Sequence, residues 1–520
     1  MKWSLFFVLF LGMYMGSNAQ EIGNFTSLEP LTKSTDFVIP STHVFQKLIE
    51  KGDPLTHGGT LPGNSDFTGY VPIDNSSENG YLSISSEKSI GGVTILDIHF
   101  NTKNKLWEIS ASQSVDFKGV AGTSKNCSGT VTPWNTIITC EEIISTSDKN
   151  RDGYYDFGWC VEIDPATKKV IDKRWSLGNF KHENVVIHHN RRTVYEGADS
   201  KPGYLYKFVA NRENDLSSGA LFVYKGSKNG TGKWIRIKND SPADRNATLA
   251  QSKRVNATVF LGIEDVEIGP DGWVYFTVKG EGRVYRFQDS DPIYGALVLK
   301  METYVGGRTY DVVHPKGVSK VDWGLGNDNL AFDGEGNLWV MQDGGKNYIW
   351  VVGKHHSQEN PDVKIFGRTP IGSEPTGITF SPDYRFLFMS IQHPLSRNNS
   401  SMQIDAAGDE IGFGKDISLV IARKEDLGDV TVSTDEVKHV NILLYPNPSN
   451  ASYNLKVDRK LSNTELRVLG IDGSLIFSKK YNNEPIDKMV IDLGDQNAGV
   501  YYFQIISNNK TIGIAKVFKK

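Results

Sequence analysis

The sequence has little of what a helical, nucleic-acid-binding or membrane-spanning protein requires. Lysine plus arginine (57) nearly balances aspartate plus glutamate (61), so the formal net charge of −4 indicates no nucleic-acid or anionic-membrane partner. Apolar residues with the period of a helix are scarce. Beyond the N-terminus, no segment is long and apolar enough to span a bilayer. These absences favour a chain built mainly of strands.

Cysteine is also scarce, because only Cys127, Cys140 and Cys160 occur. An odd number of cysteines in an exported protein leaves at least one thiol outside an intramolecular disulfide. One interpretation pairs Cys127 with Cys140 and buries Cys160. In the other, a cysteine is a thiolate ligand of a metal ion. The sequence alone leaves both open.

The first 19 residues have the features of an export signal. Lys2 precedes an apolar run, and the small residues Ser17 and Ala19 follow it. The run is too short to span a bilayer. We therefore expect a signal peptide over 1–19, cleaved near Ala19, and a protein that passes through the periplasm to the cell surface or the medium.

Glycine (51 residues) and aromatic residues (11%) are plentiful, which suits many short strands and tight turns. Four stretches repeat one pattern of an acid, an apolar strand, a turn and an aromatic strand, and they begin at Glu183, Glu264, Asp328 and Glu374. Such repeats predict the blades of a β-propeller. Carboxylates at equivalent places in successive blades would crowd onto the central channel, which is costly unless they hold cations. The sequence therefore predicts an all-β propeller with a metal site on its axis.

The chain divides into a propeller over 20–425, a polar linker over 426–440 and a tail over 441–520. We expect the residues before Tyr81 to form an arm that completes the ring of blades. The tail is too short for a large core, so a small β-sandwich is expected. Its opening Tyr-Pro-Asn-Pro (445–448) and its Ala-Gly-Val-Tyr (498–501) resemble the C-terminal sorting domain of type IX secretion, which implies that secretion machinery as a partner. An adhesive sandwich module is the alternative.

One block combines thiols with carboxylates. Asn126-Cys127-Ser128-Gly129 is followed by Thr139-Cys140-Glu141-Glu142. Carboxylates select Ca²⁺ or Mg²⁺, and a thiolate beside them favours a transition metal such as iron. The alternative is a buried cysteine with solvated glutamates.

The same block resembles the signature of the PhoX-type alkaline phosphatase family. The resembling segments follow the family's order and cover about residues 60–420: GTSKNCSGTVTPWNTIITCEE (122–142), LGNFKHEN (177–184), GNDNLAFDGEGNLWVMQD (326–343), GSEPTGITFSPD (372–383) and MSIQHP (389–394). The resemblance implies a six-bladed propeller with a cluster of Fe³⁺ and Ca²⁺ in its channel. It also implies hydrolysis of phosphate monoesters without zinc.

Carried over by position, the resemblance implies Cys140 as an iron ligand. It implies catalytic carboxylate ligands at Glu141, Glu264 and Glu374, and further metal ligands at Glu87, Glu183 and Asp199. Phosphate monoesters are dianions with poor leaving groups, so cations that neutralise the transferring phosphoryl group suit this chemistry. The chain departs from the family pattern at Ser85-Ser86, where an imidazole is lost before Glu87, and at Ala198, where an acid is lost before Asp199.

A second acidic segment has oxygen-bearing side chains at alternate positions: Asp148, Asn150, Asp152 and Asp156, with Gly153 at the sixth place. This resembles the start of an EF-hand calcium loop. The twelfth place is Trp159, so the bidentate glutamate is missing. A separate calcium-stapled loop and a plain turn rich in Asx residues both remain open.

The sequence thus predicts an exported, metal-dependent phosphomonoesterase that acts as a monomer on small phosphate esters. A non-catalytic cell-surface propeller that binds a ligand or a protein is the alternative. A lactonase on the same scaffold is a third interpretation, and it would not need the Cys140 thiolate. Lys279 follows a blade strand and could meet an anionic substrate, but exposed lysines are common, so no role is assigned to it.

Overall fold

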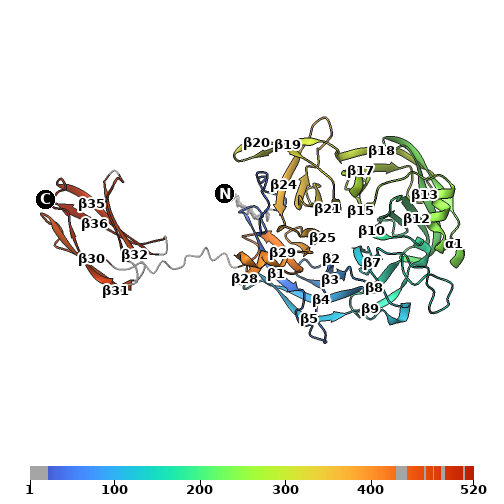
Figure 1. Ribbon diagram of the computed structural model, residues 1–520, viewed down its shortest axis with the longest axis horizontal. Helices are drawn as coiled ribbons and strands as arrows, with labels where there is room; N and C mark the ends of the chain where they lie inside the picture. Colours follow the sequence, from blue (N-terminus) through green and yellow to red (C-terminus); the bar gives the residue numbers. More distant parts are fainter. Residues whose placement is uncertain (1–20, 429–441, 462–463, 472, 482–485, 508–509) are drawn as a thin grey trace, which may run out of the picture. The chain divides into compact units, whose positions relative to one another are not determined.

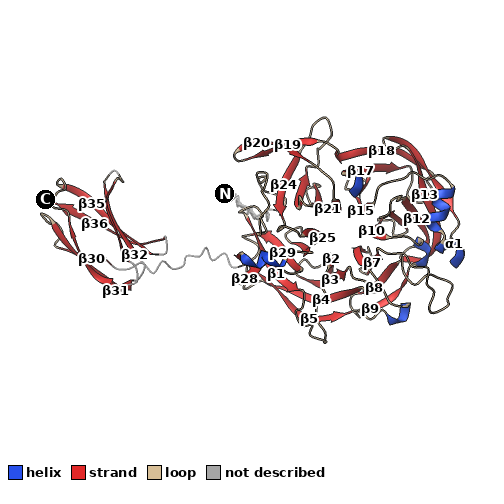
Figure 2. Ribbon diagram, viewed as in Figure 1, coloured by secondary structure: helices blue, strands red, loops and turns tan. Residues whose placement is uncertain are grey.

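The computed structural model describes residues 21–428, 442–461, 464–471, 473–481, 486–507 and 510–520. The chain forms two compact units, Met1–Asp429 and Val430–Lys520. Strands predominate in both units (Figures 1 and 2). The predicted signal peptide and most of the predicted linker lie outside the described residues.

The first unit is a β-propeller of six four-stranded antiparallel blades, each with its innermost strand on the channel (Figure 1). From the inside outward, the first blade consists of β2 (Ser65–Pro72), β3 (Asn79–Ser86), β4 (Gly92–Asn101) and β5 (Leu106–Ser114). The second blade consists of β6 (Asn126–Val131), β7 (Ile137–Glu141), β8 (Cys160–Asp164) and β9 (Lys169–Lys173). The third blade consists of β10 (His182–Ile187), β11 (Thr193–Ala198), β12 (Leu205–Arg212) and β13 (Asp215–Gly226). The fourth blade consists of β15 (Ile263–Ile268), β16 (Val274–Val278), β17 (Arg283–Asp289) and β18 (Leu297–Gly306). The fifth blade consists of β21 (Asn327–Phe332), β22 (Leu338–Gln342), β23 (Tyr348–Val352) and β24 (Val363–Arg368). The sixth blade consists of β25 (Glu374–Phe380), β26 (Leu387–Gln392), β29 (Ile417–Arg423) and β1 (His43–Glu50). The predicted six-bladed propeller is confirmed.

The two ends of the propeller sequence close its ring. The arm strand β1 pairs antiparallel with β29, from His43 opposite Arg423 to Glu50 opposite Ile417. The sixth blade therefore combines strands from both ends of the unit. Closure of this kind leaves the ring without a free blade edge at the seam.

Turn chemistry and aromatic packing explain why the repeats fold as blades. The turns after the inner strands β15 and β21 place Gly272 and Gly336 at φ +77° and +85°, a left-handed conformation that glycine adopts without strain. The aromatic strands then bury large side chains between blades. Between the fourth and fifth blades, for example, Tyr275 packs in one cluster with Trp350. Sequence repeats become blades because each buries an apolar face that it cannot cover alone.

The remaining elements of this unit lie outside the four-stranded pattern. They are β14 (Gly230–Ile237), which joins β13 to β18 in one nine-stranded sheet, the hairpins β19 (Thr309–His314) with β20 (Gly317–Asp322) and β27 (Met402–Ile404) with β28 (Glu410–Gly412), the helices α1 (Pro242–Asn246) and α2 (Thr248–Arg254), and the 3₁₀ turns Lys118–Val120, Trp175–Leu177, Lys279–Glu281 and Ser396–Ser400. No helix among the described residues is long and apolar enough to cross a membrane.

The second unit is a small β-sandwich. One sheet has the order β30 (Ile442–Tyr445), β31 (Ser452–Leu461), β34 (Ile486–Asp492), and the other has the order β33 (Leu475–Tyr481), β32 (Thr464–Gly470), β35 (Gly499–Ser507), β36 (Lys510–Lys519). Alternate residues of β32 are buried, and side chains from both sheets, such as Tyr453 and Phe503, share one core. The predicted all-β fold of the tail is confirmed.

Candidate metal centre

Each innermost strand of the propeller begins with a side chain that can bind a metal. These side chains are Asp66, Cys127, Glu183, Glu264, Asp328 and Glu374, from β2, β6, β10, β15, β21 and β25. In the first five strands the pairing register shifts at this residue: His182 and Val185 are paired with β11, for example, while Glu183 is not. A β-bulge frees a residue from the ladder and re-aims its side chain. The bulges therefore explain why five of these side chains face the channel, whereas Glu374 stays paired with Gln392 at the start of its strand.

The side chains surround a cavity of about 190 Å³. Its lining comprises the six residues above together with Glu87, Glu142, Asp199, Lys279 and Gln392. Eight carboxylates and one thiol thus meet a single lysine in the lining of this cavity. Such an excess of buried negative charge is costly unless cations or protons compensate it.

The donor atoms form three overlapping groups in which all ligand atoms lie within 4.8 Å of one another. The groups are Asp66, Glu87 and Cys127; Cys127, Glu142 and Glu183; and Glu183, Glu264 and Asp328. The Cys127 Sγ lies 2.8 Å from Glu183 Oε1 and 3.2 Å from Asp66 Oδ2. Cys127 and Glu183 belong to two groups each, so the geometry suits neighbouring cations that share ligands.

Two of these carboxylates have buried oxygens that no hydrogen bond satisfies. Glu183 Oε2 and Glu264 Oε1 have no hydrogen-bond partner among the described residues. Native proteins seldom leave a buried polar atom unpaired unless it binds an ion or water. The unpaired oxygens therefore fit a cation site.

Burial and mutual repulsion raise the pKa of Glu183, Asp328 and Glu374 when no cation is bound. Burial raises the pKa of Glu183 well above its usual range, and the charge of Glu264 adds to the effect. Burial also raises the pKa of Asp328 to about 6, and burial together with Asp343 raises that of Glu374 to about 9. Such perturbed acids gathered in a cleft are typical of functional sites.

Two lysines form ion pairs with acids at the cavity. Lys125 pairs with Glu87 at 2.7 Å. Lys279 Nζ lies 2.8 Å from Asp343 Oδ2 and 3.4 Å from Glu264 Oε2. Burial disfavours the charged form of Lys279, but the carboxylates, Asp328 first, outweigh burial and raise its pKa. This lysine is therefore a fixed positive charge beside the acids.

An opening of about 480 Å³ leads to the same residues. Its lining includes Lys181, Lys201 and Lys279, together with Asp199 and Glu264 of the acidic cavity. Three lysines and two carboxylates thus line this opening together.

The other end of the channel is different in character. A wider cavity of about 700 Å³ lies there and is lined by later residues of the same inner strands. A polar layer precedes it: Asn329 donates to Ser128 Oγ at 3.2 Å and accepts from the Gly377 N–H at 2.7 Å, and Asp265 accepts from the Leu330 N–H at 2.7 Å. These hydrogen-bonded groups contrast with the unpaired acid oxygens at the first end.

The structure brings together five of the residues that the sequence predicted as ligands: Glu87, Glu183, Asp199, Glu264 and Glu374. It does not bring Cys140 or Glu141 to the cavity. Both lie on β7, the second strand of its blade. Cys140 faces Cys160, and Glu141 is buried in an ion pair with Lys173 at 2.9 Å.

The physical reason for this correction is the position of the strand. The innermost strand of the blade is β6, so Cys127 takes the place that a carboxylate holds in the other blades, and Glu142 reaches the cavity from just beyond β7. Asp66, Asp328 and Lys279 also line the cavity, although none of them was predicted as a site residue. Asp328 heads one of the recognised repeats, so its place in the repeat is a signal that could have identified it.

The three cysteines, all within the described residues, are free thiols, so the predicted alternative of a Cys127–Cys140 disulfide is not present. The acidic loop near Asp148 closes on its own main chain. Asp148 accepts from the Gly153 N–H at 3.0 Å, and Asp152 accepts from the Tyr154 N–H at 2.8 Å. These contacts are those of a turn rich in Asx residues, and the separate calcium loop stays a prediction.

A family model described as "Alkaline phosphatase PhoX" matches residues 97–395, and one described as "Secretion system C-terminal sorting domain" matches residues 443–520. The chain belongs to the PhoX alkaline phosphatase family. Its second unit is a sorting domain, which indicates export to the cell surface or the medium and handling by type IX secretion.

A solved PhoX is similar in fold to this chain. The structure of Pseudomonas fluorescens PhoX in complex with vanadate, a transition-state analogue, is 20% identical, with a TM-score of 0.60 over 78% of this chain and 99% of that chain. A gluconolactonase from Xanthomonas campestris is 11% identical over 72% of this chain and 99% of its own, with a TM-score of 0.31, too low to assign a relation. No functionally curated protein matches the chain.

Proposed function

We propose that the chain is an exported, metal-dependent phosphomonoesterase and that the acidic cavity on the propeller axis is its active site. The observation that carries the proposal is the convergence of one metal-binding side chain from each of six blades, with buried oxygens left unpaired. Membership of the PhoX alkaline phosphatase family supports the reaction class.

The donor atoms suit the two cations that the family implies. The two groups that contain Cys127 combine a thiol with carboxylates, which suits Fe³⁺. The group of Glu183, Glu264 and Asp328 offers oxygen atoms alone, which suits Ca²⁺. In this assignment Cys127 and Glu142 replace Cys140 and Glu141. When bound, such cations neutralise the charge that develops on a transferring phosphoryl group.

The protein's own residues bind and orient the ester. The reaction consumes a phosphate monoester and water, breaks the bond between phosphorus and the ester oxygen, and yields an alcohol and inorganic phosphate. Lys181 and Lys201 attract the dianion to the opening, and Lys279 meets it at the border of the acidic cavity. The burial of Glu183 and Glu264 keeps bulk water from the acids, which strengthens every charge interaction there.

The decisive experiment measures metal content and hydrolysis on the same full-length preparation. We expect iron and calcium to co-purify, and p-nitrophenyl phosphate to be hydrolysed at a rate that falls on chelation and returns when both metals are restored. Cys127→Ser should lose iron and most of the rate, since a hydroxyl replaces a thiolate poorly.

Two outcomes would contradict the proposal. Iron and calcium bound without hydrolysis of any monoester would favour the non-catalytic binding propeller. Full hydrolysis by a protein without metals would remove the cation cluster from the mechanism. A phosphodiester of the same chromophore is the matched control, because faster turnover of the diester would assign the site to another class of ester.

A further inference from the structure

A second group of donor side chains lies between the second and third blades, away from the acidic cavity. Cys140 on β7 and Cys160 on β8 stand directly opposite each other in the antiparallel register. His182 begins β10, and Glu196 lies on the neighbouring strand β11. All four side chains are fully buried, with relative exposures of 0%. None of them lines the acidic cavity.

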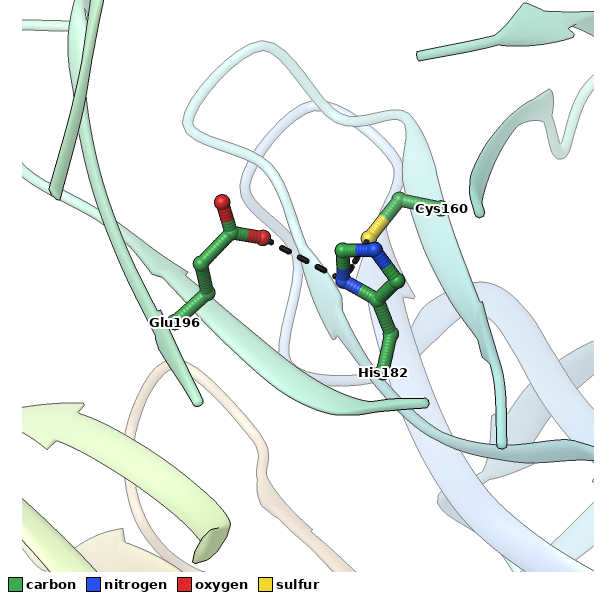
Figure 3. A group of neighbouring side chains, drawn as sticks. All are labelled: Cys160, His182 and Glu196. Carbon is green, nitrogen blue, oxygen red and sulfur yellow. Dashed lines mark hydrogen bonds and ion pairs between the residues drawn. The ribbon is translucent and has the colours of Figure 1, made fainter. Parts of the chain in front are cut away.

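The ligand atoms of Cys160, His182 and Glu196 all lie within 4.8 Å of one another, and Cys140 stands beside Cys160 but outside this group. The two Sγ atoms are 3.7 Å apart, Cys160 Sγ is 3.3 Å from His182 Nδ1, and Nδ1 is 3.3 Å from Glu196 Oε2. With ordinary zinc–ligand distances, a tetrahedral site has sulfur–sulfur, sulfur–nitrogen and nitrogen–oxygen edges of about 3.8, 3.6 and 3.3 Å. Figure 3 shows Nδ1 of His182 between the thiol and the carboxylate.

The histidine ring is oriented as a metal ligand. Its Nε2 lies 3.0 Å from the Gly178 carbonyl oxygen and donates to it, so Nδ1 of the neutral ring presents a lone pair to the group. Metal-binding histidines usually donate their second ring N–H in this way. The adjacent Phe180 ring stacks on the imidazole at a centroid distance of 3.7 Å and holds its plane.

Glu196 provides an independent sign of a ligand. Neither of its carboxylate oxygens is satisfied by a hydrogen bond within the described residues, although the side chain is fully buried, and Oε2 lies 3.3 Å from His182 Nδ1. A buried carboxylate with so little compensation costs several kcal/mol unless a cation or a proton neutralises it. Full burial also excludes a substrate, so the thiol and imidazole are not placed for nucleophilic catalysis.

We propose that Cys160, His182 and Glu196 bind one structural Zn²⁺ ion that joins the second blade to the third, and that Cys140, whose Sγ lies 3.7 Å from that of Cys160, supplies the fourth ligand when the ion is bound. Zn²⁺ is a d¹⁰ ion that accepts sulfur, nitrogen and oxygen ligands in a closed tetrahedral site. Binding releases the two thiol protons to solvent, and the thiolates and the carboxylate then neutralise the ion. The site is separate from the proposed catalytic cluster, and this proposal does not depend on that one.

The test measures zinc in full-length protein produced with zinc supplied. We expect about one zinc per chain in the wild type and in Cys127→Ser, and its loss in Glu196→Gln, which keeps the shape of the side chain. Cys160→Ser should lose it as well. In protein loaded with Co²⁺ instead, the intense visible bands of a tetrahedral cobalt thiolate should be present in wild type and absent in Cys160→Ser.

Three results would overturn the proposal. The first is wild-type protein without zinc above trace. The second is zinc retained at wild-type level by Glu196→Gln. The third is a peptide map in which Cys140 and Cys160 form a disulfide, since that bond removes both thiolates. If Cys160→Ser does not fold, the cobalt spectrum of the wild type and the zinc content of Glu196→Gln still decide the question.

Discussion

Replacement of Glu264 by glutamine tests directly whether the buried carboxylates of the channel hold cations. The Glu264 oxygen atoms belong to a group with Glu183 and Asp328 in which the ligand atoms lie within 4.8 Å of one another. At that separation two carboxylates repel each other by about 3.5 kcal/mol at an effective dielectric constant of 20. Glutamine keeps the shape of the side chain but removes its charge.

The expected loss follows from the same electrostatics. A cation bound between these acids is attracted by each of the three carboxylates. The cost of removing water from the ion offsets part of this attraction. We therefore expect a metal affinity about a hundredfold weaker, which is about 2.7 kcal/mol of metal-dependent stabilisation. The turnover number should fall by about 10²–10³, the usual cost of one preorganised charge interaction in an active site.

The assay compares Glu264→Gln with Glu267→Gln. Glu267 lies on the same strand, but it lines the wide cavity at the other end of the channel. For both variants, bound iron and calcium, the kcat for p-nitrophenyl phosphate and the Tm with and without chelator are measured. Only Glu264→Gln should lose metal and rate. Equal losses in both variants, or none in either, would refute the reasoning.

Three further outcomes follow from the structure. In steady-state kinetics, Lys279→Met should raise the KM for the ester several-fold more than Lys279→Arg does, because arginine keeps the positive charge. Equal KM values in the two variants would show that the ester binds elsewhere. Iron analysis should find Cys127→Ser depleted and Cys140→Ser close to wild type, and the reverse result would restore the original ligand assignment. A chain that ends at Gly428 should keep the Tm of the propeller, measured by calorimetry, but should remain in the periplasm of the native host. Export of this shortened chain would contradict the role of the tail. Deletion of His43–Glu50 should lower the Tm, because the sixth blade loses a strand.

Much of the fold could be predicted because repeated strands carry their period in the sequence. The acids Glu183, Glu264 and Glu374 could be found for the same reason, since each heads a repeat in a constant register. Equivalent positions in the blades of a ring all face its axis. The meeting of these acids at one cavity could therefore be predicted without knowing any long-range contact. The closing pair of β1 and β29 is different, because nothing local fixes which distant strand completes a ring.

The cysteine could not be assigned from spacing. Cys127 and Cys140 lie on adjacent strands of one blade, and only the order of those strands about the axis decides which side chain reaches the channel. In this blade a thiol stands where the repeat has an acid, so the pattern of carboxylates hides it. Asp66 was missed because its blade shows no clear repeat, and Lys279 because exposed lysines seldom carry function.

The start of β10 links the two donor groups of the propeller. His182 remains in the ladder, opposite Ala198, while Glu183 sits at the bulge and turns to the channel. One peptide bond therefore connects a ligand of the proposed zinc site to a carboxylate that two channel groups share. In the two proposals, the ion between the blades and the cluster on the axis are therefore separate sites whose ligands are neighbours at the start of β10.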